Sequence, residues 1–248
     1  MTYDVITRAR RTTRRRVTAI LIATVAAVCA VAAAVIISAG PNRSASSPMG
    51  PVLVRPETTS TGQAALPDDL DWVDVAGVSI PVSKQAGPHT TSDGQARGFA
   101  HDRGGAVLAA AHILVRANPQ VGPSVFEPTL RTQVVGADAA SIRVQVAQAY
   151  DELRRQMGVA HGQPAGRLNA TLLGYRILSY TDDQVALRLL TEAPDGSGSS
   201  LMVSTEVRVR WTGSDWALQA PAGGTFDQAV TVVLDPYTAM FLPFSAGR

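Results

Sequence analysis

The sequence predicts one N-terminal transmembrane helix followed by an α+β domain outside the cytoplasm. Three observations support this prediction: a charge-free apolar run near the N-terminus, a central region with three helix-like segments, and a final region of alternating residues separated by short turns. Helices followed by an antiparallel meander are typical of α+β folds. Because a strongly twisted sheet can wrap around helices, we expect a cone-like domain of about three helices packed on a curved antiparallel sheet.

The apolar run covers residues 17–39 and contains no charged side chain. A helix of this length, at about 1.5 Å per residue, spans about 35 Å and can cross a hydrocarbon core of about 30 Å. A cleaved signal peptide is the alternative, but its apolar region is usually about 7–15 residues long. The length of the run therefore favours an uncleaved anchor.

A basic tail, residues 1–16, precedes the run and has a net charge of +5, because six arginines stand against Asp4 alone. This asymmetry predicts a cytoplasmic N-terminus, a single pass through the cell membrane and an extracytoplasmic C-terminal domain. The rest of the chain holds 16 basic and 19 acidic residues. We therefore expect no direct nucleic-acid binding by the outer domain. The residues predicted to set the topology are Arg8, Arg10, Arg11, Arg14, Arg15 and Arg16.

The segment after the apolar run, residues 40–69, combines five prolines with many serines and threonines. It has too little apolar surface to offset the entropy of ordering, so it is predicted to be a disordered linker. The predicted organisation is a cytoplasmic tail (1–16), a transmembrane helix (17–39), a linker (40–69) and an extracytoplasmic domain (70–248).

The outer domain opens with a β-prone patch, residues 72–82, which Gly77 and Pro81 interrupt. We expect an irregular strand or a hairpin there, followed by a polar loop over residues 87–98. The first helix is then predicted over residues 104–116, with Asp102 as its N-cap, ending before Asn118 and Pro119.

Two further helices are predicted. The second runs over residues 128–135, because proline suits the first helical position and glycine the position after the end. The third begins after Asp138 and ends before Gly158, and Asp151 and Arg155 are expected to pair on its exposed side. Its buried stripe is predicted to comprise Ile142, Val146, Ala149, Tyr150, Leu153 and Met157.

Four antiparallel strands are predicted over residues 168–180, 184–192, 201–211 and 216–220, because only short turns separate them. In the third strand the residues alternate, so one face carries Leu201, Val203, Thr205, Val207, Val209 and Trp211 and the other Met202, Ser204, Glu206, Arg208 and Arg210. The apolar segment 225–244 is expected to join the core as an edge strand or short helix. A docking segment is the alternative, which we disfavour because large exposed apolar patches are rare.

No catalytic or metal-binding motif is recognisable in the sequence, so we expect neither a cofactor nor an enzyme. His101 and His112 would be about 16 Å apart on one helix, too far for a shared metal ion. The other two histidines, His89 and His161, lie in glycine-containing segments, and the only cysteine, Cys29, lies within the apolar run. In a His101–Asp102 pair, the aspartate is better explained as a helix cap.

The order of helices and strands resembles the nuclear-transport-factor-2-like fold, in which some members place catalytic groups inside a cone. Here His112, Tyr150 and Tyr175 are the conceivable lining groups. The simpler interpretation, which we favour, is that all three are packing residues of the core, since no acid–base pair accompanies them.

The basic tail, single membrane helix, Pro/Ser linker and cone-like domain together resemble the bitopic scaffold subunits of type IV secretion and conjugation systems. Residues 98–116 and 126–136 are also similar to uncharacterised membrane proteins of mobile elements in GC-rich Gram-positive bacteria. The resemblance implies a non-enzymatic assembly component with the membrane and envelope proteins as partners, and a possible homo-oligomer. Alternatives are a membrane-tethered module that binds a small apolar ligand and, third, an envelope enzyme.

Overall fold

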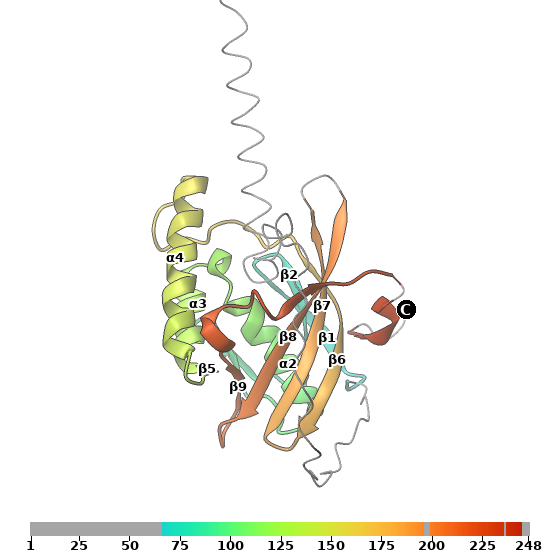
Figure 1. The fold of residues 1–248 in the computed structure, drawn as a ribbon. Coiled ribbons are helices and arrows are strands. Elements are labelled where there is room, and N and C mark those ends of the chain that lie inside the picture. The colour runs from blue at the N-terminus through green and yellow to red at the C-terminus, as the bar shows by residue number, and fades with distance from the viewer. Residues whose placement is uncertain (1–65, 196–198, 236, 245–248) are drawn as a thin grey trace, which may run out of the picture.

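A computed structural model describes residues 66–195, 199–235 and 237–244, and in this part of the chain it shows a mixed α+β domain with three α-helices and a curved sheet (Figure 1). The α+β prediction is confirmed for the domain. The predicted membrane helix and all but the last residues of the predicted linker lie outside the described residues. No helix within them is both long and apolar enough to cross a membrane.

The main sheet has the strand order β11-β6-β7-β8-β9-β5, with β10 added to the β9 side of β8. All neighbours are antiparallel except β5 and β9, which are parallel. Its strands are β5 (Val134–Val135), β6 (Thr171–Thr181), β7 (Gln184–Pro194), β8 (Ser200–Trp211), β9 (Trp216–Gln219), β10 (Val230–Val232) and β11 (Leu242–Pro243). The four predicted strands correspond to β6 to β9, and the alternation predicted for β8 is present, with its inner residues more buried.

Two small hairpins precede the helices. The β-prone patch forms one of them, from β1 (Leu70–Val75) and β2 (Val78–Ser83). The second, β3 (Thr90–Ser92) with β4 (Gln95–Arg97), lies where a loop was predicted. That prediction was wrong because Asp93 and Gly94 both adopt positive φ angles, as a tight hairpin turn requires.

The first helix, α2 (Arg103–Arg116), lies behind the sheet in Figure 1 and is buried on every side. Residues 106–113 have no exposed surface. As predicted, Asp102 caps the helix, and its Oδ1 accepts a hydrogen bond from the Gly105 amide at 2.7 Å. A short helix η1 (Pro119–Val121) follows it.

The second helix was predicted in the wrong place. The structure has α3 at Pro123–Thr132, so Pro123 begins the helix and Pro128 lies inside it. Val134 and Val135 form β5 instead of a last helical turn, because they pair with β9 far along the chain.

The third helix, α4 (Ala139–Met157), ends as predicted at Gly158, which has a left-handed conformation. Asp138 precedes it, but its side chain forms no cap hydrogen bond. Asp151 pairs with Arg154 rather than with Arg155, which pairs with Glu152. Met157, expected in the buried stripe, is 43% exposed because the helix projects beyond the core at this end.

The C-terminal segment ties the two sides of the sheet together. β10 pairs with β8 and β11 pairs with β6, so residues 233–235 and 237–241, which we call the strap, pass from one side to the other. Figure 1 shows this segment crossing the face of the sheet opposite α2. A short helix η3 (Tyr237–Met240) belongs to the strap.

Candidate interaction surface

Among the residues that the structure describes, the histidine and the two tyrosines considered as lining groups are engaged in contacts within the domain. His112 lies in the middle of the buried helix α2, with Nε2 2.9 Å from the Pro81 carbonyl and Nδ1 2.7 Å from Arg116 Nη1. Because a guanidinium only donates, Nδ1 must accept and Nε2 carries the proton toward Pro81. His112 therefore fastens α2 to β2, as expected of a core residue.

Burial controls the charge of this pair. Burial, reinforced by the positive charge of Arg116, lowers the pKa of His112 to about 3. Burial likewise lowers the pKa of Arg116 to about 10. At neutral pH the histidine is therefore uncharged and the arginine charged, and no carboxylate among the described residues forms an ion pair with that arginine.

The two tyrosines considered as lining groups are also packing residues. The Tyr150 hydroxyl donates to the Gln163 carbonyl at 2.8 Å and accepts from the Gly162 amide at 2.9 Å, which holds the loop after α4. Tyr175 is 1% exposed and its ring lies 5.2 Å from that of Phe244. Neither hydroxyl is placed beside His112 as an acid–base partner would be.

A small apolar cavity lies between α2 and the inner face of the sheet. Its volume is about 40 Å³, and Leu114, Leu172 and Leu189 are among the side chains that line it. Pockets for drug-sized ligands usually measure about 300–1,000 Å³. This cavity has room for only about three water molecules.

The remaining histidines take part in local structure. His101 stacks on Trp211 with ring centroids 4.0 Å apart, and its Nε2 lies 2.8 Å from the Asp182 carbonyl. His89 Nε2 lies 3.1 Å from the Lys84 carbonyl, and His161 packs edge-on against Tyr150. Within the described ranges, no three His, Cys, Asp or Glu residues come close enough to hold a metal ion.

The outer face of the sheet, opposite α2, carries most of the charge on these strands. Arg176 of β6 lies opposite Arg188 of β7, which lies opposite Glu206 of β8. Two further arginines, Arg208 and Arg210, continue along β8 toward its end. We call these five residues the arginine face, and its net charge is +3.

Glu206 orders part of this face. Its carboxylate lies 3.4 Å from Arg188 Nη2 and 3.5 Å from Arg208 Nη2. Arg176 and Arg210 form no ion pair with any described residue, and the sulfur of Met240 lies 3.7 Å from Arg176 Nη1. These two cations thus have no counter-charge among the residues that the structure describes.

The strap lies over the other half of the outer face. Leu190 and Ser204 point outward from β7 and β8, yet they are only 4% and 2% exposed. The strap itself presents apolar side chains to solvent: Leu234 is 67% exposed and Tyr237 62%. The segment after residue 225 is therefore only partly buried. Phe244 joins the core as predicted, whereas Leu234, Tyr237 and Met240 are exposed.

A groove adjoins the arginine face at β8. This strand pairs with β9 through Val209–Trp211 and with β10 through Val203–Thr205, so residues 206–208 lie between two partners. The chain leaves β9, forms η2 (Ala222–Gly224) against α4 and returns to β8, where the Glu206 amide donates to the Ala229 carbonyl at 2.8 Å. The groove so framed has a volume of about 440 Å³, and Glu206, Arg208, Gln219, Phe226 and Gln228 help to line it.

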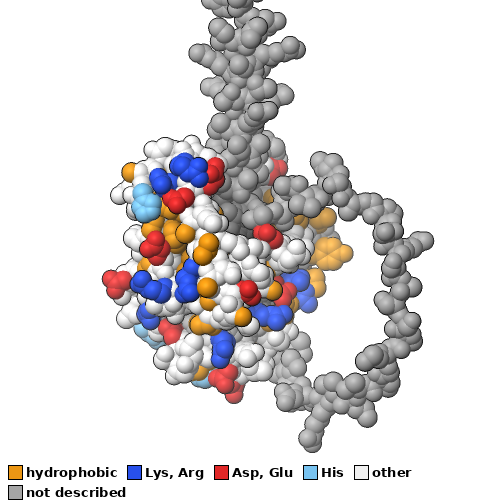
Figure 2. All heavy atoms as spheres, turned by 60° about the vertical axis from the view of Figure 1, so that its left-hand side comes forward, with side chains coloured by type: hydrophobic (Ala, Val, Ile, Leu, Met, Phe, Trp, Pro, Cys, Tyr) orange, Lys and Arg blue, Asp and Glu red, His pale blue; other side chains and the backbone are white. Residues whose placement is uncertain are grey.

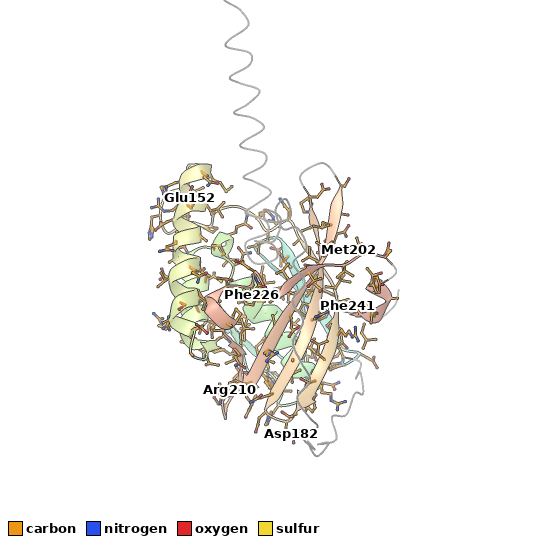
Figure 3. All side chains as sticks on the ribbon, in the orientation of Figure 1. Glu152, Asp182, Met202, Arg210, Phe226 and Phe241 are labelled. Atoms are coloured by element: carbon orange, nitrogen blue, oxygen red, sulfur yellow. The ribbon has the colours of Figure 1, made fainter. Side chains whose placement is uncertain are left out.

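Figure 3 labels residues that mark this surface. Met202 and Arg210 lie toward opposite ends of β8, and Phe241 belongs to the strap. Figure 2, turned toward α4, shows basic side chains beside apolar ones near its right-hand edge. Sequence alternation had placed Arg208 and Arg210 on one face, but it gave no sign that Arg176 and Arg188 join them, because that depends on the register between strands. The topology-setting arginines, Arg8 to Arg16, lie outside the described residues.

Comparison with known proteins identifies one family. A family model described as a domain of unknown function (DUF8175) matches residues 30–239. No curated protein and no solved structure matches the chain. The match begins within the predicted membrane helix and includes the arginine face and most of the strap.

Proposed function

We propose that this chain, which belongs to the DUF8175 family, is a membrane-anchored, non-enzymatic assembly component whose outer domain binds other proteins through the arginine face and the strap. The observation that carries the proposal is the exposure of Leu234, Tyr237 and Met240 on the strap, where Met240 contacts Arg176 of the sheet. Exposed tyrosine and apolar side chains next to arginine are typical of protein-binding hot spots.

The small cavity and the engaged side chains of the interior also support a role in protein binding. The cavity of about 40 Å³ is far smaller than a ligand pocket, and His112 is held between Pro81 and Arg116. The distinctive chemistry of the domain therefore lies on its surface. A chain that acts by contact needs such a surface and no catalytic group.

The cellular setting of the proposal comes from the sequence. The charge-free run 17–39 and the six arginines before it suit an anchor with a cytoplasmic tail. This plan, together with an outer domain whose order of helices and strands resembles the nuclear-transport-factor-2-like fold, resembles that of scaffold subunits in conjugation-type DNA transfer systems. We infer an envelope complex of this type, with other envelope proteins and further copies of the chain as candidate partners.

Photo-crosslinking in membranes of the native host tests the proposal. A benzophenone amino acid would replace Tyr237 on the strap, and the control would carry it in place of Glu152 on α4, which Figure 3 places far from the strap. We expect protein adducts from position 237 that contain subunits of a transfer or secretion complex, and none of these from position 152. Absence of any protein adduct at position 237 would overturn the proposal.

A further inference from the structure

We propose that the partner segment bound at the arginine face is an extended, acidic peptide with a carboxylate at every second residue and apolar side chains at its two ends. This inference rests on the proposed function and specifies the chemistry of the partner. It is drawn from the spacing of the arginines, the position of Glu206, and the place where the groove and the strap adjoin them.

The arginines lie on three adjacent strands, with Arg176 opposite Arg188 and with Arg208 and Arg210 farther along β8. Arg176 and Arg188 lie on adjacent strands, which are about 4.8 Å apart, and Arg208 and Arg210 lie two residues apart on β8, about 6.7 Å. An extended peptide presents every second side chain at nearly the same 6.7 Å spacing, so alternate carboxylates can meet Arg208 and Arg210 in succession. A guanidinium fork suits carboxylates in particular, because it can donate two parallel hydrogen bonds.

Glu206 shows how a carboxylate fits among these arginines. It lies between Arg188 and Arg208, within 3.5 Å of each. This internal acid also holds two of the arginines in place, so their side chains lose less entropy when a partner binds. A surface meant for unspecific attraction to anionic lipid would gain nothing from an acid at its centre, so the pattern favours a protein segment that is matched in register.

Apolar contacts flank the arginines on both sides. Met240 of the strap touches Arg176, and Leu234 and Tyr237 are exposed nearby in the same strap. On the other side, the groove of about 440 Å³ offers Phe226 together with Gln219 and Gln228. A peptide that crosses the face can thus place the apolar side chains of its two ends at the strap and at Phe226, with its acidic side chains between them.

The charge requirement is tested in the same crosslinking experiment. In the variant Arg208→Glu/Arg210→Glu, the adduct from position 237 should fall at least about tenfold, because like charges then face the partner. The matched control Arg131→Glu/Arg155→Glu makes the same charge change on α3 and α4 and should keep the adduct.

The outcomes separate the two proposals. Crosslinked segments rich in Asp or Glu, lost in the Arg208→Glu/Arg210→Glu variant alone, would support the acidic peptide. Protein adducts that lack carboxylates, or that survive this charge reversal, would overturn this inference and leave the proposed function standing. An adduct with phospholipid only would overturn both.

A defined probe gives a second measurement. A ten-residue peptide with glutamate at every second residue of its middle part and leucine at both ends is titrated into the full chain in neutral detergent, and the same peptide with lysine in place of glutamate serves as the control. We expect binding of the glutamate peptide alone, weakened at 0.5 M salt and in Arg208→Glu/Arg210→Glu. Equal binding of both peptides, or of neither, would overturn the inference.

Discussion

At the scale of single residues, His112 links the stability of the domain to pH. An exposed histidine in the unfolded chain has a pKa of about 6.5, whereas burial in the folded chain lowers the pKa of His112 to about 3. The unfolded state therefore binds the proton first. The stabilising effect of the neutral histidine is complete above pH 6.5 and is lost as the pH falls toward 3.

We expect the free energy of unfolding to fall by about 1.4 kcal/mol for each pH unit below 6.5 on account of this residue. His112→Gln keeps a donor and an acceptor but does not titrate, so this part of the slope should disappear. His89→Gln changes an exposed histidine and should leave the slope unchanged. Urea unfolding between pH 4 and pH 8 measures all three proteins, and an equal slope in wild type and His112→Gln would contradict the assignment.

Two adjacent glycines at the start of α2 should respond in opposite directions to alanine. A Cβ on Gly105 would lie 2.0 Å from the Ala100 carbonyl oxygen, whereas on Gly104 the nearest atoms are 3.4 Å away. We expect Gly105→Ala to cost about 2 kcal/mol or more, because the backbone before the helix must shift. Gly104→Ala should stabilise by up to about 1 kcal/mol through helix propensity. Chemical denaturation gives the free energy of unfolding of both variants. Equal changes in the two would contradict the close approach of residue 105 to the Ala100 carbonyl oxygen.

At the scale of secondary-structure elements, the ends of a helix were predictable from the sequence where contacts within a few residues determine them. Asp102 and Gly158 set the start of α2 and the end of α4 through contacts within a few residues, and both positions were predicted. The second helix could not be placed, because Pro123 and Pro128 each suit a helix start. Only the parallel pairing of Val134 and Val135 with β9, a contact between distant segments, shows which one begins it.

The candidate surface was less predictable for the same reason. The alternation in β8 predicts the common face of Arg208 and Arg210, since that pattern is local. Arg176 joins them only through the pairing of β6 with β7, whose register shifts between Ile177 and Ser179. The Asp93–Gly94 pair is a local hairpin signal for β3 and β4, within the segment predicted to be a polar loop.

The junction of β11 with β6 depends on Gly174. A Cβ there would lie 2.6 Å from the Leu242 carbonyl oxygen, so Gly174→Ala should displace β11 from the sheet. We expect faster amide hydrogen exchange in residues 242–244, with a loss of stability of about 1–2 kcal/mol. Ser179→Ala, on an exposed part of the same strand, should leave this exchange unchanged. Unaltered protection in Gly174→Ala would show that β11 adapts without leaving β6.

At the scale of the whole molecule, the division of charge predicts how the chain lies across the membrane. In a Cys29→Ser background, a cysteine introduced by Ser60→Cys should react with an impermeant maleimide in intact host cells, because residue 60 follows the apolar run. A cysteine introduced by Thr2→Cys should react only after the membrane is permeabilised. The reverse labelling pattern would contradict the proposed orientation.

The strap has a consequence for solubility. A sheet whose outer strand ends in open hydrogen-bonding groups is a template for pairing with other chains, and natural proteins protect such strands with bulges or covering segments. Here β11 pairs with β6 at Gly174 and Tyr175, and the shifted register between Ile177 and Ser179 interrupts the rest of that strand. The C-terminal segment that we propose to bind a partner therefore also protects the edge of the sheet, through β11.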